Sequence, residues 1–378
     1  MKKAKVLHAL RGKQLRCLNG NAVPLKKPQP RARDGTPIAS GSDMNPPLIH
    51  LPVIDLGGLA GAAGAASTSV LARTLDQACR EIGFVVVKGH RVAPSVLQAA
   101  FDAGFAFFDA PESVKHSAVP PDGRVRGFTP LLRQRLAASL QKETPPDLFE
   151  RFRMGPFDLP DDSYHAERVQ GWFAPNIWPG SLPRMRPALQ TYYLAMQELA
   201  ADLMRLFALA LELPPRYFEP SIDRHISSLC LNHYPAMAAA AQPGQLRAGE
   251  HTDYGSLTIV APSDAPGRLQ VRARDGIWVE VDPPAGHFVV NIGDLMAQWT
   301  NDRWVSTLHR VGLPDQAESA HARRLSLVFF HQPNDDALVE CLPTCLAPGA
   351  APRYAPVTSG EHLRLKINRH FTPAIQTA

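Results

Sequence analysis

Three residues whose types can bind a metal ion stand in the second half of the chain: His251, Asp253 and His309. One residue separates His251 from Asp253, so in an extended segment their side chains point to the same face. His309 lies in a later apolar segment that could form a further strand and supply a third ligand. Three ligands on one side of a metal leave positions open on the other side. The spacing therefore predicts a metal site at which small molecules can react.

Two histidines and one carboxylate are the ligand set of the facial triad in non-haem Fe(II) oxygenases, where a cosubstrate and O₂ meet at the metal. A lone His-x-Asp pair arises often by chance, and many of the 14 histidines must be surface or core residues. Other polar pairs with the spacing of a strand are therefore needed to support this interpretation.

One such pair lies in the alternating segment 324–330. In a strand, Arg324 and Ser326 share a face with Val328 and Phe330. A guanidinium that points into an apolar interior is stable there only when it meets an anion. Arg324 with Ser326 therefore predicts a carboxylate-binding site. An exposed strand with Arg324 outward, or an Arg paired to an internal acid, is the alternative.

Short strands between Gly, Pro and Asp turns must position these residues. This rhythm favours an antiparallel sandwich or barrel for the second half of the chain. In the first strand, Asn232 and Tyr234 place two more polar groups on one face. The strands are expected at residues 226–234, 251–261, 268–273, 277–281, 286–292, 304–312 and 323–332.

The first half of the chain has a helical character. Apolar residues recur at helical spacing in three segments, and Gly83 supplies a stop for the first of them. Residues 117–180 are rich in Pro and Gly and are expected to be irregular. The expected helices are 69–82, 95–108 and 182–213, and the expected strands are 48–56 and 84–87.

The composition limits the classes of protein. Hydrophobic residues make up 45% and charged residues 20% of the 378, which is ordinary for a soluble globular protein. No apolar run reaches the roughly 18 residues of a membrane span. Residues 1–33 hold ten Lys and Arg and no acid, and the remainder holds 30 basic and 35 acidic residues, a net charge of −5. Nucleic-acid binding by the body is therefore not expected.

Residues 1–46 are expected to form a disordered basic extension, since they lack hydrophobic periodicity. An organelle transit peptide, or a true start at Met44, is the alternative. The five cysteines are few and widely spread, which is typical of a reducing compartment. We therefore expect a cytoplasmic protein, and we expect it to be a monomer.

The order Asn-x-Tyr-Pro, His-x-Asp, distal His and Arg-x-Ser resembles the isopenicillin N synthase-like branch of the Fe(II)/2-oxoglutarate-dependent dioxygenases. The resemblance covers about residues 48–335. The first half contributes segments similar to the family's motifs: Leu51-Pro52-Val53-Ile54-Asp55-Leu56, Cys79 to Phe84 with Gly89-His90, Arg126-Gly127-Phe128, and Asn176-Ile177-Trp178-Pro179.

The resemblance implies a mainly β fold with packed helices: a double-stranded β-helix (jelly-roll) core and a helical N-terminal half. It implies decarboxylation of 2-oxoglutarate to succinate and CO₂ by O₂, with hydroxylation, desaturation or ring formation on a small metabolite. Separately, the high content of Ala, Pro and Arg is typical of a GC-rich bacterial source and favours secondary metabolism as the setting. The expected regions are 1–46 (extension), 47–220 (N-terminal region), 221–335 (jelly-roll core) and 336–378 (a C-terminal segment packed on the core). The implied iron ligands are His251, Asp253 and His309, and the implied cosubstrate contacts are Arg324, Ser326, Tyr234 and Asn232.

Two alternatives stay open at this point. An oxidase of the isopenicillin N synthase type uses Fe(II) and O₂ without 2-oxoglutarate, and a cupin-like binding module performs no catalysis. The substrate is not identified. His233 is expected to pack away from Asn232, and His331 to lie at a surface strand end. Candidate pocket segments are 124–133, 173–178, 330–333 and 361–369.

Overall fold

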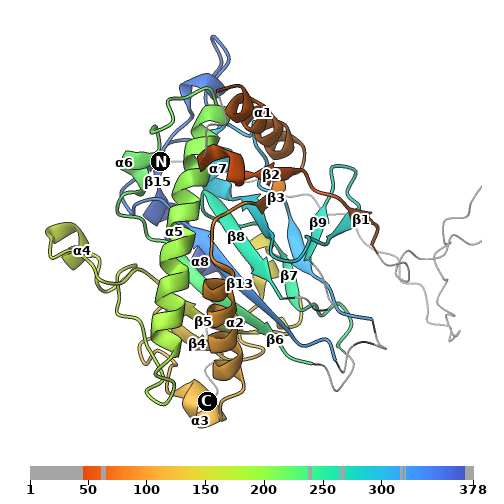
Figure 1. Ribbon diagram of the computed structural model, residues 1–378, viewed down its shortest axis with the longest axis vertical. Coiled ribbons are helices and arrows are strands. Elements are labelled where there is room, and N and C mark those ends of the chain that lie inside the picture. Colours follow the sequence, from red (N-terminus) through yellow and green to blue (C-terminus); the bar gives the residue numbers. More distant parts are fainter. Residues whose placement is uncertain are drawn as a thin grey trace, which may run out of the picture. The chain divides into compact units, whose positions relative to one another are not determined.

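Two β-sheets form the centre of the molecule (Figure 1). The computed structural model describes residues 46–60, 65–236, 241–263, 265, 269–315, 318 and 321–370, so the predicted extension lies outside the described residues except for Pro46. The larger sheet has eight strands, in the order β2 (Val53–Asp55), β3 (Phe84–Lys88), β11 (Phe288–Ile292), β8 (Leu257–Pro262), β13 (Arg324–His331), β6 (Ser228–Tyr234), β5 (Glu150–Met154) and β4 (Gly127–Thr129).

The smaller sheet completes the jelly roll. It has five strands, in the order β1 (Leu48–Ile49), β10 (Trp278–Val281), β9 (Leu269–Arg272), β12 (His309–Val311) and β7 (Ala248–His251). Apolar side chains from both sheets meet between them, among them Phe84 and Val289 of the larger sheet and Val271 and Val279 of the smaller. The predicted jelly-roll core is therefore confirmed.

Three helices cover the outer face of the larger sheet: α1 (Ala65–Glu81), α2 (Pro94–Phe108) and α5 (Met185–Ala210). Figure 1 shows α5 running along this sheet, with α1 and α2 beside it. The alternation of β13 explains the packing, because Leu325, Leu327 and Phe329 join the core beneath the helices. Arg324 and Ser326 therefore point to the opposite, inner face, as the sequence predicts.

The remaining elements are short. They comprise a two-stranded sheet of β14 (Leu338–Val339) and β15 (Val357–Thr358), the helices α3 (Glu112–His116), α4 (Ser163–Glu167), α6 (Glu219–Ile222), α7 (Asp294–Trp299) and α8 (Ser359–His370), and the 3₁₀ helices η1 (Leu56–Ala60), η2 (Leu136–Leu140) and η3 (Pro343–Cys345). No helix among the described residues combines the length and apolar composition of a membrane span. The division of the chain at 220 stays a prediction, because both sheets draw strands from each side of it.

Several sequence expectations about the strands were wrong. The expected strand 48–56 is divided between β1 in the smaller sheet and β2 in the larger sheet. Residues 117–180 contain β4 and β5, which extend the larger sheet. The hydrophobic pattern of β5 is hidden because its inner face carries Arg151 and Arg153. The expected strand 251–261 is instead divided: β7 ends at His251, and β8 begins only at Leu257. Close packing at this bend requires a glycine, since a Cβ on Gly255 would lie 2.3 Å from the carbonyl oxygen of His331.

Gly83 ends α1 as expected, and two constraints require glycine there. Its φ is +68°, in the left-handed region that side chains disfavour. A Cβ at this position would also lie 2.1 Å from the carbonyl oxygen of Val305. This turn delivers the chain from the helical layer directly into the buried strand β3.

Candidate active site

His251, Asp253 and His309 converge, although they come from separated stretches of the chain. Pairing of β7 with β12 places His309 directly opposite His251, and their ring centroids lie 4.3 Å apart. Oδ1 of Asp253 is 3.9 Å from Nε2 of His251 and 3.7 Å from Nε2 of His309. One ligand atom from each of the three residues lies within 4.8 Å of the others. This separation suits a single metal ion.

Backbone carbonyl groups fix the tautomer of both imidazoles. Nδ1 of His251 donates to the carbonyl oxygen of Gly249 over 2.8 Å, and Nδ1 of His309 donates to that of Thr307 over 3.0 Å. A carbonyl oxygen can only accept, so the proton resides on Nδ1 in both rings. Both Nε2 lone pairs are therefore directed to the shared space, as metal-binding histidines require.

Asn291, which no sequence pattern singled out, orients the carboxylate. Its Nδ2 donates to Oδ2 of Asp253 over 2.7 Å, and Oδ1 therefore faces the imidazoles. Burial raises the pKa of Asp253, but the positive charges that His309 and His251 carry when protonated, together with the Asn291 hydrogen bond, outweigh burial and lower it. The side chain of Asp253 is therefore an ionised carboxylate. Asn291 lies on β11. In the sequence, nothing distinguishes it from any other polar residue in a buried strand.

The four residues predicted to hold the cosubstrate face one another across two paired strands. In the register of β13 and β6, Arg324 is opposite Tyr234 and Ser326 is opposite Asn232. All four are buried. Nη1 of Arg324 donates to the carbonyl oxygen of Ala265 over 3.0 Å.

A second guanidinium lies near Arg324. Burial, and then the positive charge of Arg324, lower the pKa of Arg247 to about 10. Arg247 remains a cation at neutral pH, and its ring contact with Tyr234 places it at the same end of the sheet. Two buried like charges attract an anion to this region.

A cavity of about 500 Å³ opens beside the three converging residues, and His251 and Asp253 form part of its wall. Three of the four predicted pocket segments contribute to this wall: residues within 124–133, Phe330 with Gln332, and Leu363 with Ile367. Segment 173–178 does not: Phe173 packs on Tyr164, and Trp178 packs on Phe152. Trp172 takes its place in the wall.

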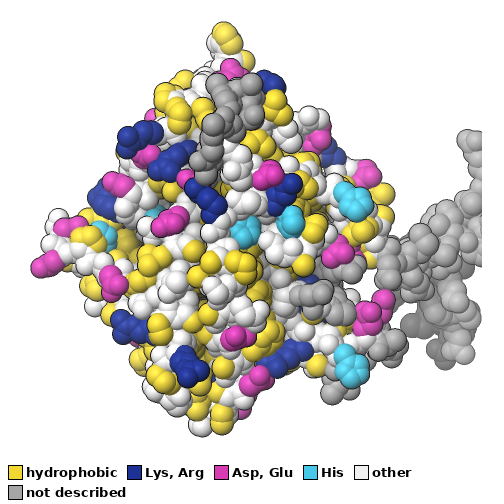
Figure 2. All heavy atoms as spheres, in the orientation of Figure 1, with side chains coloured by type: hydrophobic (Ala, Val, Ile, Leu, Met, Phe, Trp, Pro, Cys, Tyr) yellow, Lys and Arg dark blue, Asp and Glu magenta, His cyan; other side chains and the backbone are white. Residues whose placement is uncertain are grey.

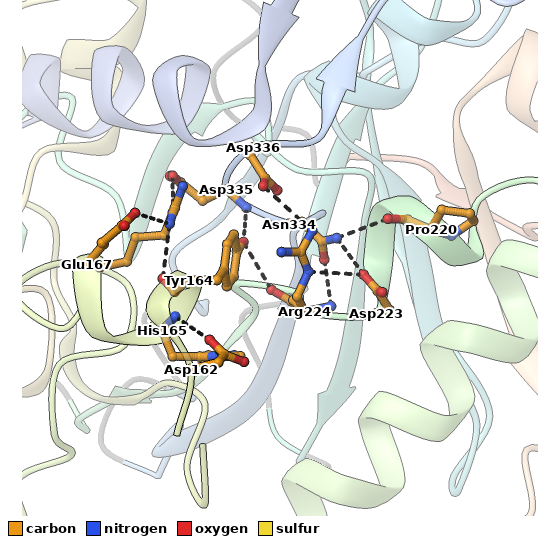
Figure 3. A network of polar contacts seen from close by, with 11 residues as sticks. Asp162, Tyr164, His165, Glu167, Pro220, Asp223, Arg224, Asn334, Asp335 and Asp336 are labelled. Atoms are coloured by element: carbon orange, nitrogen blue, oxygen red, sulfur yellow. Dashed lines mark hydrogen bonds and ion pairs between the residues drawn. The ribbon is translucent and has the colours of Figure 1, made fainter. Parts of the chain in front are cut away.

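Asp335 ties together the elements that cover this cavity. Its carboxylate accepts hydrogen bonds from Arg168 Nε over 2.9 Å, Trp172 Nε1 over 2.6 Å and Arg364 Nη1 over 2.9 Å. Figure 3 shows the neighbouring network, in which Tyr164 lies between Asp335 and Arg224. Burial raises the pKa of Asp335, but the hydrogen bonds from Arg168 and Trp172 outweigh burial and lower it. Asp335 thus joins helix α8 to the loop that carries Trp172.

Replacement of Asp335 with Ala is expected to destabilise the protein by about 3 kcal/mol, because two guanidiniums and an indole lose a buried anionic acceptor. Urea denaturation measures this loss. The neighbouring Asp336 is the control: its side chain is 44% exposed and lies 3.6 Å from Arg224, so Asp336→Ala should cost less than about 1 kcal/mol. Equal losses in the two variants would contradict a special role of Asp335.

The sequence predicts the positions of two other histidines, His233 and His331. His233 points away from Asn232, as expected: it stacks on Phe108 and contacts Oε1 of Glu150 through Nδ1 over 2.8 Å. The expectation for His331 was wrong, since this residue is 2% exposed. It ends β13, but the bend after Asp253 covers it, and its Nδ1 lies 2.7 Å from Oγ of Ser256.

Because His331 is buried, the stability of the folded protein is expected to fall in acid. Burial, and then the nearby His225, lower the pKa of His331 to about 3, and burial lowers that of His225 to about 4. In the unfolded chain both pKa values are about 6.5. Between pH 6.5 and 4 the unfolded state binds more protons, so stability falls as the pH falls, by up to about 1.4 kcal/mol per pH unit for each histidine.

Urea denaturation of His331→Gln at pH 7 and 5 should therefore show a shallower pH dependence than that of the wild type. His50→Gln is the control, because His50 is exposed, and its pH dependence should match the wild type. An equally steep loss of stability in His331→Gln would show that other groups cause the acid sensitivity.

Two family models match the chain. Residues 51–181 match the model described as non-haem dioxygenase in morphine synthesis N-terminal, and residues 226–333 match the 2OG-Fe(II) oxygenase superfamily. The 2-oxoglutarate-Fe(II) type oxidoreductase hxnY of Emericella nidulans is 30% identical over 321 residues, which cover 83% of this chain and 88% of that protein. A homoarginine-6-hydroxylase of Oryza sativa subsp. japonica is 33% identical, over 79% of this chain and 88% of that protein.

Solved structures agree with this relationship. A crystal structure of a Neurospora crassa protein in complex with alpha-KG and thymine matches with a TM-score of 0.74 at 28% identity, over 87% of this chain and 99% of that chain. The chain therefore belongs to the 2OG-Fe(II) oxygenase superfamily. It is an Fe(II)- and 2-oxoglutarate-dependent dioxygenase of the isopenicillin N synthase-like type. The relatives favour neither of the two alternatives, which are an oxidase that needs no 2-oxoglutarate and a binding module that performs no catalysis.

Proposed function

We propose that His251, Asp253 and His309 hold the ferrous ion. The donor set supports this assignment, because two Nε2 lone pairs and one carboxylate oxygen face a common space. The hydrogen bond from Asn291 holds the carboxylate in that orientation. When bound, iron supplies the activation of O₂ that is coupled to decarboxylation of 2-oxoglutarate to succinate and CO₂.

We further propose that Arg324 and Ser326 bind the distal carboxylate of 2-oxoglutarate, with Tyr234 and Asn232 as additional contacts. The cross-strand register supports this, since the four polar side chains form adjacent pairs on the inner face. A guanidinium can bind a carboxylate with two parallel hydrogen bonds, and the hydroxyl of Ser326 adds a third. Tyr234 also packs against Ala248 and Val311 of the strands that carry the two histidines.

The primary substrate is a small-molecule metabolite that occupies the cavity. The cavity's volume of about 500 Å³ suits a compact molecule, and its wall joins apolar side chains to the predicted metal site. The residues around it hold the substrate and limit access of water while one of its bonds is oxidised, by hydroxylation, desaturation or ring formation.

We also propose a cytoplasmic monomer that binds neither nucleic acid nor membrane. The four described cysteines, Cys79, Cys230, Cys341 and Cys345, are free thiols, which supports a reducing compartment. On the face seen in Figure 2, Lys and Arg side chains are interspersed with Asp and Glu. That mixture gives no support to a nucleic-acid surface there.

Anaerobic titration of the protein with Fe(II) and then 2-oxoglutarate tests the proposed function. We expect one ferrous ion and one 2-oxoglutarate per chain, and succinate release that increases when the correct metabolite is added. A panel of metabolites scored for succinate then identifies the substrate class. Oxidation of a metabolite without consumption of 2-oxoglutarate would contradict the proposal.

A further inference from the structure

On the inner face of the larger sheet, residues that lie opposite one another on the adjacent strands β13, β6, β5 and β4 form rows across the sheet. Several of these rows contain polar residues. Ser326 is opposite Asn232, which is opposite Arg151 on β5, whose Nε donates to Oδ1 of Asn232 over 2.7 Å. The next row on the same face, two residues along, contains Val328, Cys230 and Arg153. At about 3.3 Å per residue, this row lies about 13 Å from the row of Arg324 along the strands.

Arg126 adds a second guanidinium to the row of Arg153. It directly precedes Gly127, which is opposite Arg153 in the pairing of β4 with β5. Arg126 is 5% exposed, and it donates from Nη1 to the carbonyl oxygen of Val125 over 2.8 Å and from Nη2 to that of Trp172. A Cβ on residue 155 would overlap its guanidinium, so Gly155 provides the space for it.

Neither guanidinium is neutralised by the described residues. Nε of Arg126 has no hydrogen-bond partner there, and Nε of Arg153 lies 3.0 Å from Sγ of Cys230. Burial, and then the charge of Arg153, lower the pKa of Arg126 to about 10, so it stays a cation at neutral pH. Both side chains line the cavity beside the predicted metal site. Two neighbouring cations in a partly buried cavity favour an anionic ligand.

The described residues of the cavity wall contain one acid, Asp253, and that side chain is already committed to the two imidazoles. A cationic group on the substrate would therefore find no carboxylate to pair with. The rest of the wall offers apolar surface, including Phe330, Ile226 and Leu363. The cavity wall thus combines cationic side chains with apolar ones.

We propose that the primary substrate is a small organic acid whose carboxylate is bound by Arg126 and Arg153, with its apolar body against Phe330, Ile226 and Leu363. This proposal rests on the proposed function, because it takes the site of Arg324 as that of the cosubstrate. Arg151 lies between the two anion sites, one row from each. The substrate carboxylate anchors the molecule, and the body is presented to the predicted metal site, which forms another part of the same wall.

Calorimetric binding to the anaerobic Fe(II)- and 2-oxoglutarate-loaded enzyme tests this inference. The probes are matched acids, primary amides and amines: 3-phenylpropionate, 3-phenylpropionamide and 3-phenylpropylamine, and the same three groups on cyclohexyl and branched alkyl bodies. At least one acid is expected to bind about tenfold or more tightly than its amide, and no amine should bind more tightly than its acid. If no acid is preferred over its amide, the proposal is wrong.

Arg153→Met should remove the preference for the acid while changing the dissociation constant of 2-oxoglutarate less than about twofold. The control is Arg133→Met, which removes an exposed guanidinium from the rim of the same cavity and should preserve the preference. Equal losses of 2-oxoglutarate and acid binding in Arg153→Met would assign this arginine to the cosubstrate and overturn the proposal. Failure of the wild type to bind 2-oxoglutarate would instead contradict the proposed function.

Discussion

Replacement of His309 with Ala is expected to abolish iron-dependent turnover while leaving the protein folded. The variant removes one of the three proposed ligands, whereas loss of a residue that merely orients a ligand already lowers metal affinity about 10- to 100-fold. We therefore expect iron affinity to fall more than about 100-fold. The packing loss is expected to be small, because the aromatic contacts of the ring are a T-shaped one with Phe84 and a tilted one with the neighbouring His251.

Metal analysis after anaerobic loading, together with succinate release, measures this effect. His321→Ala serves as the control, because His321 is exposed and lies between β12 and β13. A circular dichroism spectrum and melting temperature close to those of the wild type would show that His309→Ala is folded. Stoichiometric iron with unchanged turnover in this variant would remove His309 from the ligand set.

Replacement of Arg324 with Met is expected to raise the dissociation constant of 2-oxoglutarate about 100-fold. Two charge-assisted hydrogen bonds of about 1.5 kcal/mol each would be lost, and each 1.4 kcal/mol is a factor of ten. Arg324→Lys keeps the charge but loses the planar fork, so its affinity should fall between those of the wild type and Arg324→Met. Anaerobic titration of each Fe(II)-loaded variant with 2-oxoglutarate measures the order.

Iron binding provides the internal check on the Arg324 variants, because it should remain within about twofold of the wild type if only the anion site is damaged. Arg272→Met is the matched control: Arg272 lies on a strand of the smaller sheet and is exposed. Unchanged 2-oxoglutarate affinity in Arg324→Met would place the cosubstrate carboxylate elsewhere, and the neighbouring Arg247 would be the next residue to test.

Local patterns predicted the ligand types and most of the secondary structure. The long helix expected at 182–213 is α5, Met185–Ala210, because its apolar stripe is continuous over several turns. The alternation of β13 correctly assigned Arg324 and Ser326 to one face and Leu325 to the other. These features depend only on residues that are close along the chain, so a single sequence is enough to predict them.

The pocket could be predicted only in part. Residues 124–133 and 361–369 were among the expected pocket segments, and both contribute to the wall. Arg151 and Arg153 were missed, because a strand with charged inner positions has no amphipathic signature. The burial of His331 was missed as well, because the chain that covers it is distant in sequence.

By itself, the sequence determined the chemistry that is available: two imidazoles, a carboxylate and a guanidinium at spacings that place the near pairs on common faces. The tertiary structure decided which of these groups meet. Pairing of β7 with β12 brings His309 opposite His251, and the order β13-β6-β5-β4 aligns Arg324, Asn232 and Arg153 in successive rows. Strand register depends on packing and hydrogen bonds between distant segments, and for that reason spacing along the chain does not reveal it.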